Sequence, residues 1–135
     1  MTRPMLACAV TLAAVFTGVP GAPLAHAGPP PPCSFTLTAP QVVQVAGVAT
    51  VTATLSPAEC GPPAEPATSV ACLQMQGGDG VPRCYPSDAS GAAQVFLDPY
   101  VAGATYVATG RGCGAWIGQP PAPDCQPMGP VSATL

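Results

Sequence analysis

Cysteine is the residue type in this sequence with the most evident chemistry. The chain has seven cysteines, and all but Cys8 lie beyond residue 27. An even set of cysteines in a small exported chain is typical of a disulfide framework. A zinc site is disfavoured, because the sequence has no Cys-x-x-Cys pair and no histidine beyond residue 27. The sequence therefore predicts no metal site and three disulfides, formed by Cys33, Cys60, Cys72, Cys84, Cys113 and Cys125.

Catalysis has few suitable side chains in this chain. No lysine occurs, and the single histidine is His26, so Ser–His and Cys–His pairs are excluded beyond residue 27. Paired carboxylates would be the remaining machinery. Asp79, Asp88 and Asp98, however, stand in Gly-Asp-Gly, Ser-Asp-Ala-Ser-Gly and Asp-Pro contexts, where an aspartate usually caps its own turn. We expect a protein that is not an enzyme, with no catalytic residue and no cofactor.

The N-terminal segment has the layout of a secretory signal peptide. Arg3 supplies the positive charge, residues 5–19 form an apolar run, and the small residues Ala25 and Ala27 follow. The apolar run is shorter than the roughly 20 residues that a membrane-spanning helix needs. We therefore expect cleavage between Ala27 and Gly28, no transmembrane anchor afterwards, and a location outside the cell or in the cell envelope.

Charge narrows the range of partners for the exported part. The whole chain has six acidic and three basic residues, and beyond residue 27 the only basic side chains are Arg83 and Arg111. Binding to nucleic acid requires clustered lysine and arginine, so a nucleic-acid partner is not expected. Residues 28–33 are rich in proline and predict a short spacer, and residues 34–135 predict a single domain.

The domain reads as a series of short strands separated by turns. Glycine and proline punctuate the chain, and in "ATVTATLSP" Thr50, Thr52 and Thr54 alternate with Val51, Ala53 and Leu55, which is the period of a half-buried strand. These patterns predict an all-β, small antiparallel sandwich of about seven strands. The strands are expected at residues 34–39, 49–55, 69–76, 81–86, 93–97, 104–110 and 130–135.

One stretch carries a family resemblance. "LDPYVAGATYVATG", residues 97–110, resembles a corner of immunoglobulin-like and fibronectin type III-like sandwiches, in which a tyrosine hydroxyl bonds to backbone a few residues upstream. The resemblance implies an immunoglobulin-like sandwich with Tyr106 in this role after Gly103. The sequence departs from the family spacing by an insertion that begins at Tyr100, so Tyr100 is the alternative corner residue. The composition also resembles that of small exported actinobacterial proteins.

The expected strand order predicts the disulfide pairing. If the first two strands are antiparallel neighbours, Cys33 before one meets Cys60 after the other. Cys72 and Cys84 lie almost symmetrically about the turn at residues 77–80, one residue out of register, so a slip or bulge would join them. Cys113 and Cys125 flank the last expected loop. The alternative pairs Cys60 with Cys113 or Cys125.

A partner surface is expected at one end of the sandwich. The expected loops at residues 56–69 and 113–125 meet there with the proline-rich N-terminal spacer. Prolines hold such loops in extended shapes and lower the ordering cost of binding, and the expected contact residues are Trp116, Ile117, Pro120 and Pro121. The competing interpretation is that Trp116 folds back to cap the core.

These features together predict an interaction module with a protein or envelope partner. The first alternative is a secreted protease inhibitor, because "CGPPAEPATSVACLQMQGGDGVPRCYP" (residues 60–86) resembles small actinobacterial subtilisin inhibitors. That resemblance would place the reactive segment at Arg83 to Pro86. The second alternative is a purely structural component of the cell envelope.

The first prediction concerns export. Secreted material should begin at Gly28, because the small residues Ala25 and Ala27 form the cleavage signature. N-terminal sequencing and intact mass measure this directly. An integral membrane form that retains residues 1–27 would contradict it.

Overall fold

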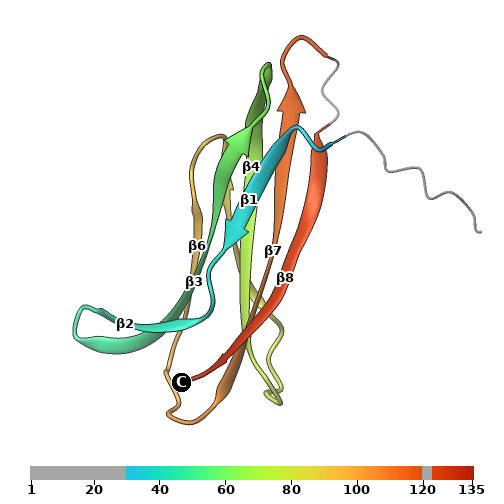
Figure 1. Cartoon of the computed structure of the whole chain (residues 1–135). Helices are drawn as coiled ribbons and strands as arrows, with labels where there is room; N and C mark the ends of the chain where they lie inside the picture. Colours follow the sequence, from blue (N-terminus) through green and yellow to red (C-terminus); the bar gives the residue numbers. More distant parts are fainter. Residues whose placement is uncertain (1–29, 120–122) are drawn as a thin grey trace, which may run out of the picture.

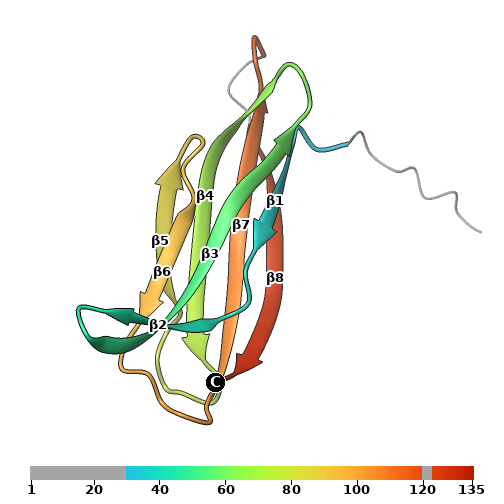
Figure 2. The same cartoon turned by 60° about the vertical axis from the view of Figure 1, so that its left-hand side comes forward.

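The computed structural model describes residues 30–119 and 123–135, and every regular element in them is a β-strand. Eight strands form two antiparallel sheets that lie face to face (Figures 1 and 2). The strands are β1 (Cys33–Leu37), β2 (Gln41–Val45), β3 (Val48–Cys60), β4 (Ala64–Met75), β5 (Arg83–Asp88), β6 (Ala93–Leu97), β7 (Thr105–Trp116) and β8 (Asp124–Thr134). The predicted all-β antiparallel sandwich is confirmed, with eight strands instead of about seven.

β3 is the centre of the first sheet. Thr52 pairs with both Gln41 of β2 and Phe96 of β6, and Leu55 pairs with both Leu37 of β1 and Ala93 of β6. A strand has two edges, so β6 occupies one edge of β3 while β1 and β2 share the other. The second sheet has the order β5-β4-β7-β8. β5 and β6 are therefore edge strands, and Figure 2 shows them next to each other on one side of the sandwich.

The core lies between the sheets and follows the predicted alternation. Val51, Ala53 and Leu55 of β3 are fully buried. They pack with inward-facing residues of the other strands, which are Phe35, Ala71, Leu73, Ala93, Val95, Tyr106 and Ala108. Thr52, which points to the opposite face, is also 0% exposed, and its hydroxyl is satisfied there, since it donates to the Val95 carbonyl at 2.9 Å and accepts from the Gln94 amide at 3.3 Å. β3 is therefore buried on both faces at this position, whereas the alternation had predicted burial of one face only.

Two glycines of β7 allow β1 to lie close to the second sheet. A Cβ atom on Gly112 would overlap the ring of Phe35, and one on Gly114 would lie 2.8 Å from the Cys33 Sγ atom. Both positions therefore require a residue without a side chain. Gln126 of β8 holds the same region, since its amide donates to the Cys33 carbonyl at 2.6 Å.

The three predicted disulfides are confirmed. Cys33–Cys60, Cys72–Cys84 and Cys113–Cys125 are present, each with a Cα–Cα distance of 4.0 Å. Each joins residues that are directly opposite in neighbouring strands of one sheet. The β4–β5 register is shifted by one residue from exact symmetry about the turn at residues 77–80, as expected, and this places Cys72 directly opposite Cys84.

The predicted strand boundaries needed two kinds of correction. β2 was not predicted; a two-residue turn at Ala46 and Gly47, with φ of 50° and 81°, joins it to β3. The loop expected at residues 56–69 is mostly strand, because β3 runs to Cys60 and β4 starts at Ala64. In the same way, β7 and β8 leave residues 117–123 between them. β4 tolerates a proline at residue 66 because its pairing with β7 has a register shift there, between Pro66 and Thr68.

Tyr106 makes the corner hydrogen bond. Its hydroxyl accepts from the backbone N–H of Val101 at 2.8 Å, and the side chain is 1% exposed. Gly103, with φ of 78°, turns the chain between them, and its N–H donates to the Leu135 carbonyl. Tyr100 packs against the core while remaining partly exposed. The hydroxyl that ties the β6–β7 connection to the core therefore belongs to Tyr106.

The second prediction tests this bond. Tyr106→Phe removes the buried hydroxyl and leaves the Val101 N–H without its acceptor, so the free energy of unfolding should fall by about 1 kcal/mol or more. Tyr100→Phe is the matched control and should change little. Urea denaturation with the disulfides intact measures both. A larger loss for Tyr100→Phe would move the corner role to Tyr100.

Candidate functional site

The groups capable of catalysis do not converge in the described part of the chain. No three His, Cys, Asp or Glu side chains among the described residues are placed to hold a metal ion. The six cysteines predicted to pair are all in disulfides. Asp98 forms an ion pair with Arg83 at 3.0 Å, with both side chains more than half exposed. This carboxylate is therefore engaged in a surface contact of small energetic value.

The predicted partner surface corresponds to one end of the sandwich. There the Gly61 N–H donates to the Pro32 carbonyl and the Ile117 N–H donates to the Pro63 carbonyl, each at 2.9 Å. These bonds join the N-terminal segment, the β3–β4 turn and the end of β7. Pro120 and Pro121 lie outside the described residues. We call the described part of this surface, Trp116 and Ile117 with Gly61, the loop end.

Trp116 is only partly covered at the loop end. Its side chain is 40% exposed, and its ring lies beside Gly61, where an added Cβ would be 3.7 Å from the Cη2 atom. The ring is not among the buried core residues. Ile117, the next residue, is 56% exposed. The loop end therefore has two partly exposed apolar side chains, and the tryptophan is neither fully free nor buried as a cap.

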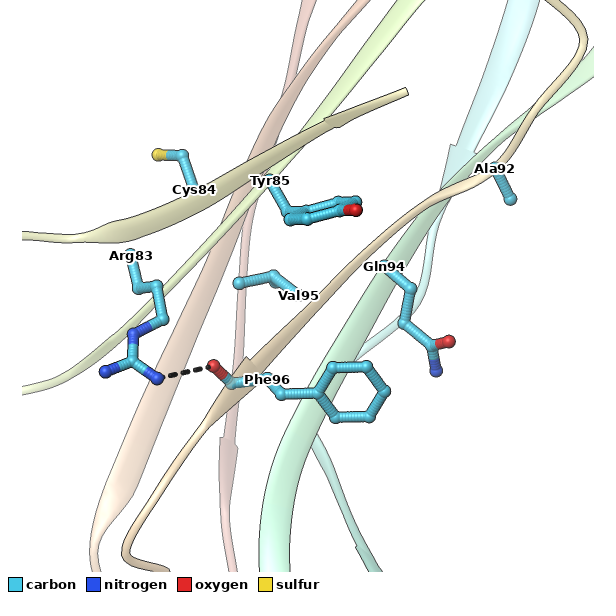
Figure 3. A pocket seen from close by; sticks show the side chains of 7 residues that line it. All are labelled: Arg83, Cys84, Tyr85, Ala92, Gln94, Val95 and Phe96. Carbon is cyan, nitrogen blue, oxygen red and sulfur yellow. Dashed lines mark hydrogen bonds between the residues drawn. The ribbon is translucent and has the colours of Figure 1, made fainter. Parts of the chain in front are cut away.

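A second candidate surface was not predicted from the sequence. A groove of about 440 Å³ runs between the edge strands β5 and β6 (Figure 3). Its walls come from Arg83, Cys84 and Tyr85 of β5 and from Gln94, Val95 and Phe96 of β6. We call it the edge groove. Both sheets contribute one wall, so the edge groove is the open side of the sandwich.

Strand register explains why Tyr85 and Arg83 face the edge groove. Tyr85 pairs with Ala71 and Arg83 pairs with Leu73. Directly opposed residues of an antiparallel pair share a face, and Ala71 and Leu73 are buried between the sheets. The side chains of Tyr85 and Arg83 therefore project toward β6 and stand over the floor that Val95 provides (Figure 3).

Arg83 closes one end of the edge groove. Its guanidinium donates to the Phe96 carbonyl at 3.4 Å and to the Asp98 carboxylate at 3.0 Å. Tyr85, which is 59% exposed, meets water beside this cation. Phe96, which is 38% exposed, pairs with Thr52, so its ring projects from the other face of β6. Cys84 lies in the wall and is bonded to Cys72, which fixes β5 to β4.

A smaller hollow lies at the other end of the sandwich. It has a volume of about 240 Å³ and is formed by the β4–β5 turn and the corner after β6. Met75, Val81, Leu97 and Tyr106 are among its mainly apolar lining residues. Tyr106 is already engaged there in the corner bond with Val101, so we assign this hollow to the packing of the corner.

The sequence contained a signal for the edge groove that was interpreted otherwise. Residues 83–86 were interpreted as part of a strand and as the reactive segment of an inhibitor, and residues 93–97 only as a strand. The signal is an exposed aromatic residue on each of two short strands, Tyr85 and Phe96. Their proximity depends on which strands form the sheet edges, and that follows from the full pairing pattern.

Comparison with known proteins gives no information about the function of this chain. No protein-family model, curated protein or solved structure matched this chain. Within the described residues, no helix is long and apolar enough to cross a membrane.

Proposed function

We propose that this chain is an exported, non-enzymatic domain that binds a partner protein through the edge groove. Export is supported by the signal-peptide layout of residues 1–27 and by three disulfides, which are typical of an oxidising extracellular environment. A non-enzymatic role is supported by the lack of any histidine or lysine beyond residue 27.

The edge groove is the observation that carries the proposal. It combines three features that recur at the centres of protein interfaces: an aromatic side chain, an arginine and an apolar floor. Tyr85, Arg83 and Val95 supply them, and Phe96 adds its backbone carbonyl. The Cys72–Cys84 disulfide holds one wall in place, so little ordering is needed when a partner binds. Trp116 at the loop end lines neither of the two hollows described above.

The inhibitor alternative receives less support. An inhibitor must present its reactive peptide free of the rest of the fold, in a protease's active site. Arg83 is instead paired with Leu73 in the sheet, and its side chain is bonded to Asp98 and to the Phe96 carbonyl. A protease would have to strip these contacts before Arg83 could enter its specificity pocket.

The third prediction tests binding at the edge groove. The oxidised domain, with a photo-activated cross-linker replacing Gln94, is exposed to the culture filtrate of the secreting cells. The cross-linked partner should be a defined species, identified by mass spectrometry. Tyr85→Ala should then weaken its binding about thirtyfold, because truncating an aromatic anchor costs about 2 kcal/mol or more.

Trp116→Ala is the matched control. It removes an aromatic side chain of similar exposure from the loop end, and it should leave affinity for the partner within a few-fold of the unchanged domain. The opposite pattern, with loss for Trp116→Ala and none for Tyr85→Ala, would move the binding site to the loop end. No cross-linked partner from filtrate or envelope fractions would favour the structural alternative.

A further inference from the structure

The free edge of β6 is the feature of the edge groove that determines what fits there. β6 pairs with β3 on one side and has no strand on its other side within the described part of the chain. Backbone N–H and C=O groups on such an edge are available to a further strand. Which residues present them follows from the hydrogen bonds around β6.

Gln94 and Phe96 are the residues that point their backbone groups into the edge groove. The Thr52 hydroxyl of β3 donates to the Val95 carbonyl at 2.9 Å, so Val95 faces β3. In an antiparallel pair the hydrogen-bonding direction alternates from residue to residue, so Gln94 and Phe96 face away from β3. The bond from Arg83 of β5 to the Phe96 carbonyl agrees with this direction.

β6 also lacks the features that usually protect a sheet edge. Residues 93–97 contain no proline and no charged residue, and the pairing of β6 with β3 has no register shift. Prolines, charges and bulges are the common protections. The two edge strands of the second sheet do carry proline, at Pro86 of β5 and at Pro127 and Pro130 of β8. β2 is unprotected too, but its hairpin stands away from the second sheet (Figure 1), so no wall faces it.

We infer that the edge groove binds an extended segment of the partner protein, which adds to β6 as a further antiparallel strand. This inference rests on the proposed function and specifies its mode of recognition. Backbone bonds to Gln94 and Phe96 supply the pairing. Alternate side chains of the segment enter the edge groove against Tyr85 and Val95, where apolar residues fit. Antiparallel addition is chosen because it is the slightly more stable pairing.

Charge fixes the chemistry at the ends of the segment. Arg83 lies at the Leu97 end of β6, and it bonds to Phe96 and Asp98. An antiparallel segment starts at this end, so its N-terminal residue meets the guanidinium, which has donors to spare beyond its present contacts. Asp88, at the far end of β5, disfavours a second carboxylate there. The preferred segment therefore has an acidic residue first and alternating apolar residues after it.

The fourth prediction tests strand addition with defined peptides on the intact oxidised domain. The probe is the capped peptide Glu-Thr-Val-Thr-Val-Thr. The control is the same peptide with N-methylated threonines, because the residues that lie opposite Gln94 and Phe96 donate the bonds to β6 when the valines face Val95. In NMR spectra with millimolar probe, amide exchange at Gln94 and Phe96 should slow several-fold, and the control should cause no slowing. A probe that begins with Lys should bind several-fold more weakly, because it meets Arg83.

A pair of variants checks the role of the β6 backbone. Gln94→Pro removes an outward N–H, which an edge strand tolerates, and should abolish slowing of exchange at Phe96. Gln94→Ala keeps the N–H and should retain the slowing. If Gln94→Pro does not fold, the N-methylated peptide on the unchanged domain still decides the question.

Two results would overturn strand addition: unchanged exchange at Gln94 and Phe96 with millimolar probe, or perturbation of the loop end alone. If Tyr85-dependent partner binding persisted in either case, the proposed function would stand and only its mode would be wrong. If the probe added to β6 while the partner's binding did not depend on Tyr85, strand addition would hold and the proposed role of the edge groove would fail.

Discussion

The contact between Phe35 and Gly112 sets how closely β1 can lie over the second sheet. The Phe35 ring occupies the space that a side chain at position 112 would need, and Cys33 lies in the same way over Gly114. The side chains of Phe35 and Cys33 of β1 therefore pack directly against the backbone of β7. Phe35 is one of the few large side chains in the core, so this contact supplies much of the apolar burial at that end of the sandwich.

Because few large side chains fill the core, the domain depends on its disulfides. Much of the remaining core is small, with Ala53, Ala71, Ala93 and Ala108 fully buried, and small side chains bury little area. Three disulfides of roughly 2–4 kcal/mol each offset that deficit. Each lies within one sheet, so the spacing between the sheets depends on side-chain packing and on side-chain bonds such as that from Gln126 to the Cys33 carbonyl. On the β5–β6 side, Val95 is buried beneath the edge groove, and Tyr85 beside it stays more than half exposed.

Much of this fold was predictable because it depends on local patterns. Alternation located β3 and β4, a short apolar run located β6, turn symmetry paired Cys72 with Cys84, and the Gly-x-Thr-Tyr context identified Tyr106. β2 was missed because Ala46-Gly47 is a weaker hairpin signal than Asn-Gly or Asp-Gly. β3 and β4 were predicted too short because Pro57 and Pro66 were read as loop residues. The edge groove was missed because it depends on which strands end each sheet, a property of the whole pairing pattern.

A double-mutant cycle at positions 35 and 112 tests the central contact most directly. Gly112→Ala alone should lower the free energy of unfolding by about 1–3 kcal/mol, the usual effect of overpacking. In a Phe35→Ala background the same change should be neutral or stabilising, because alanine is about 0.5–1 kcal/mol better than glycine inside a strand. Gly80→Ala, where no atom lies within 4 Å of the added Cβ, is the control for a harmless substitution. An equal loss from Gly112→Ala in both backgrounds would contradict the account.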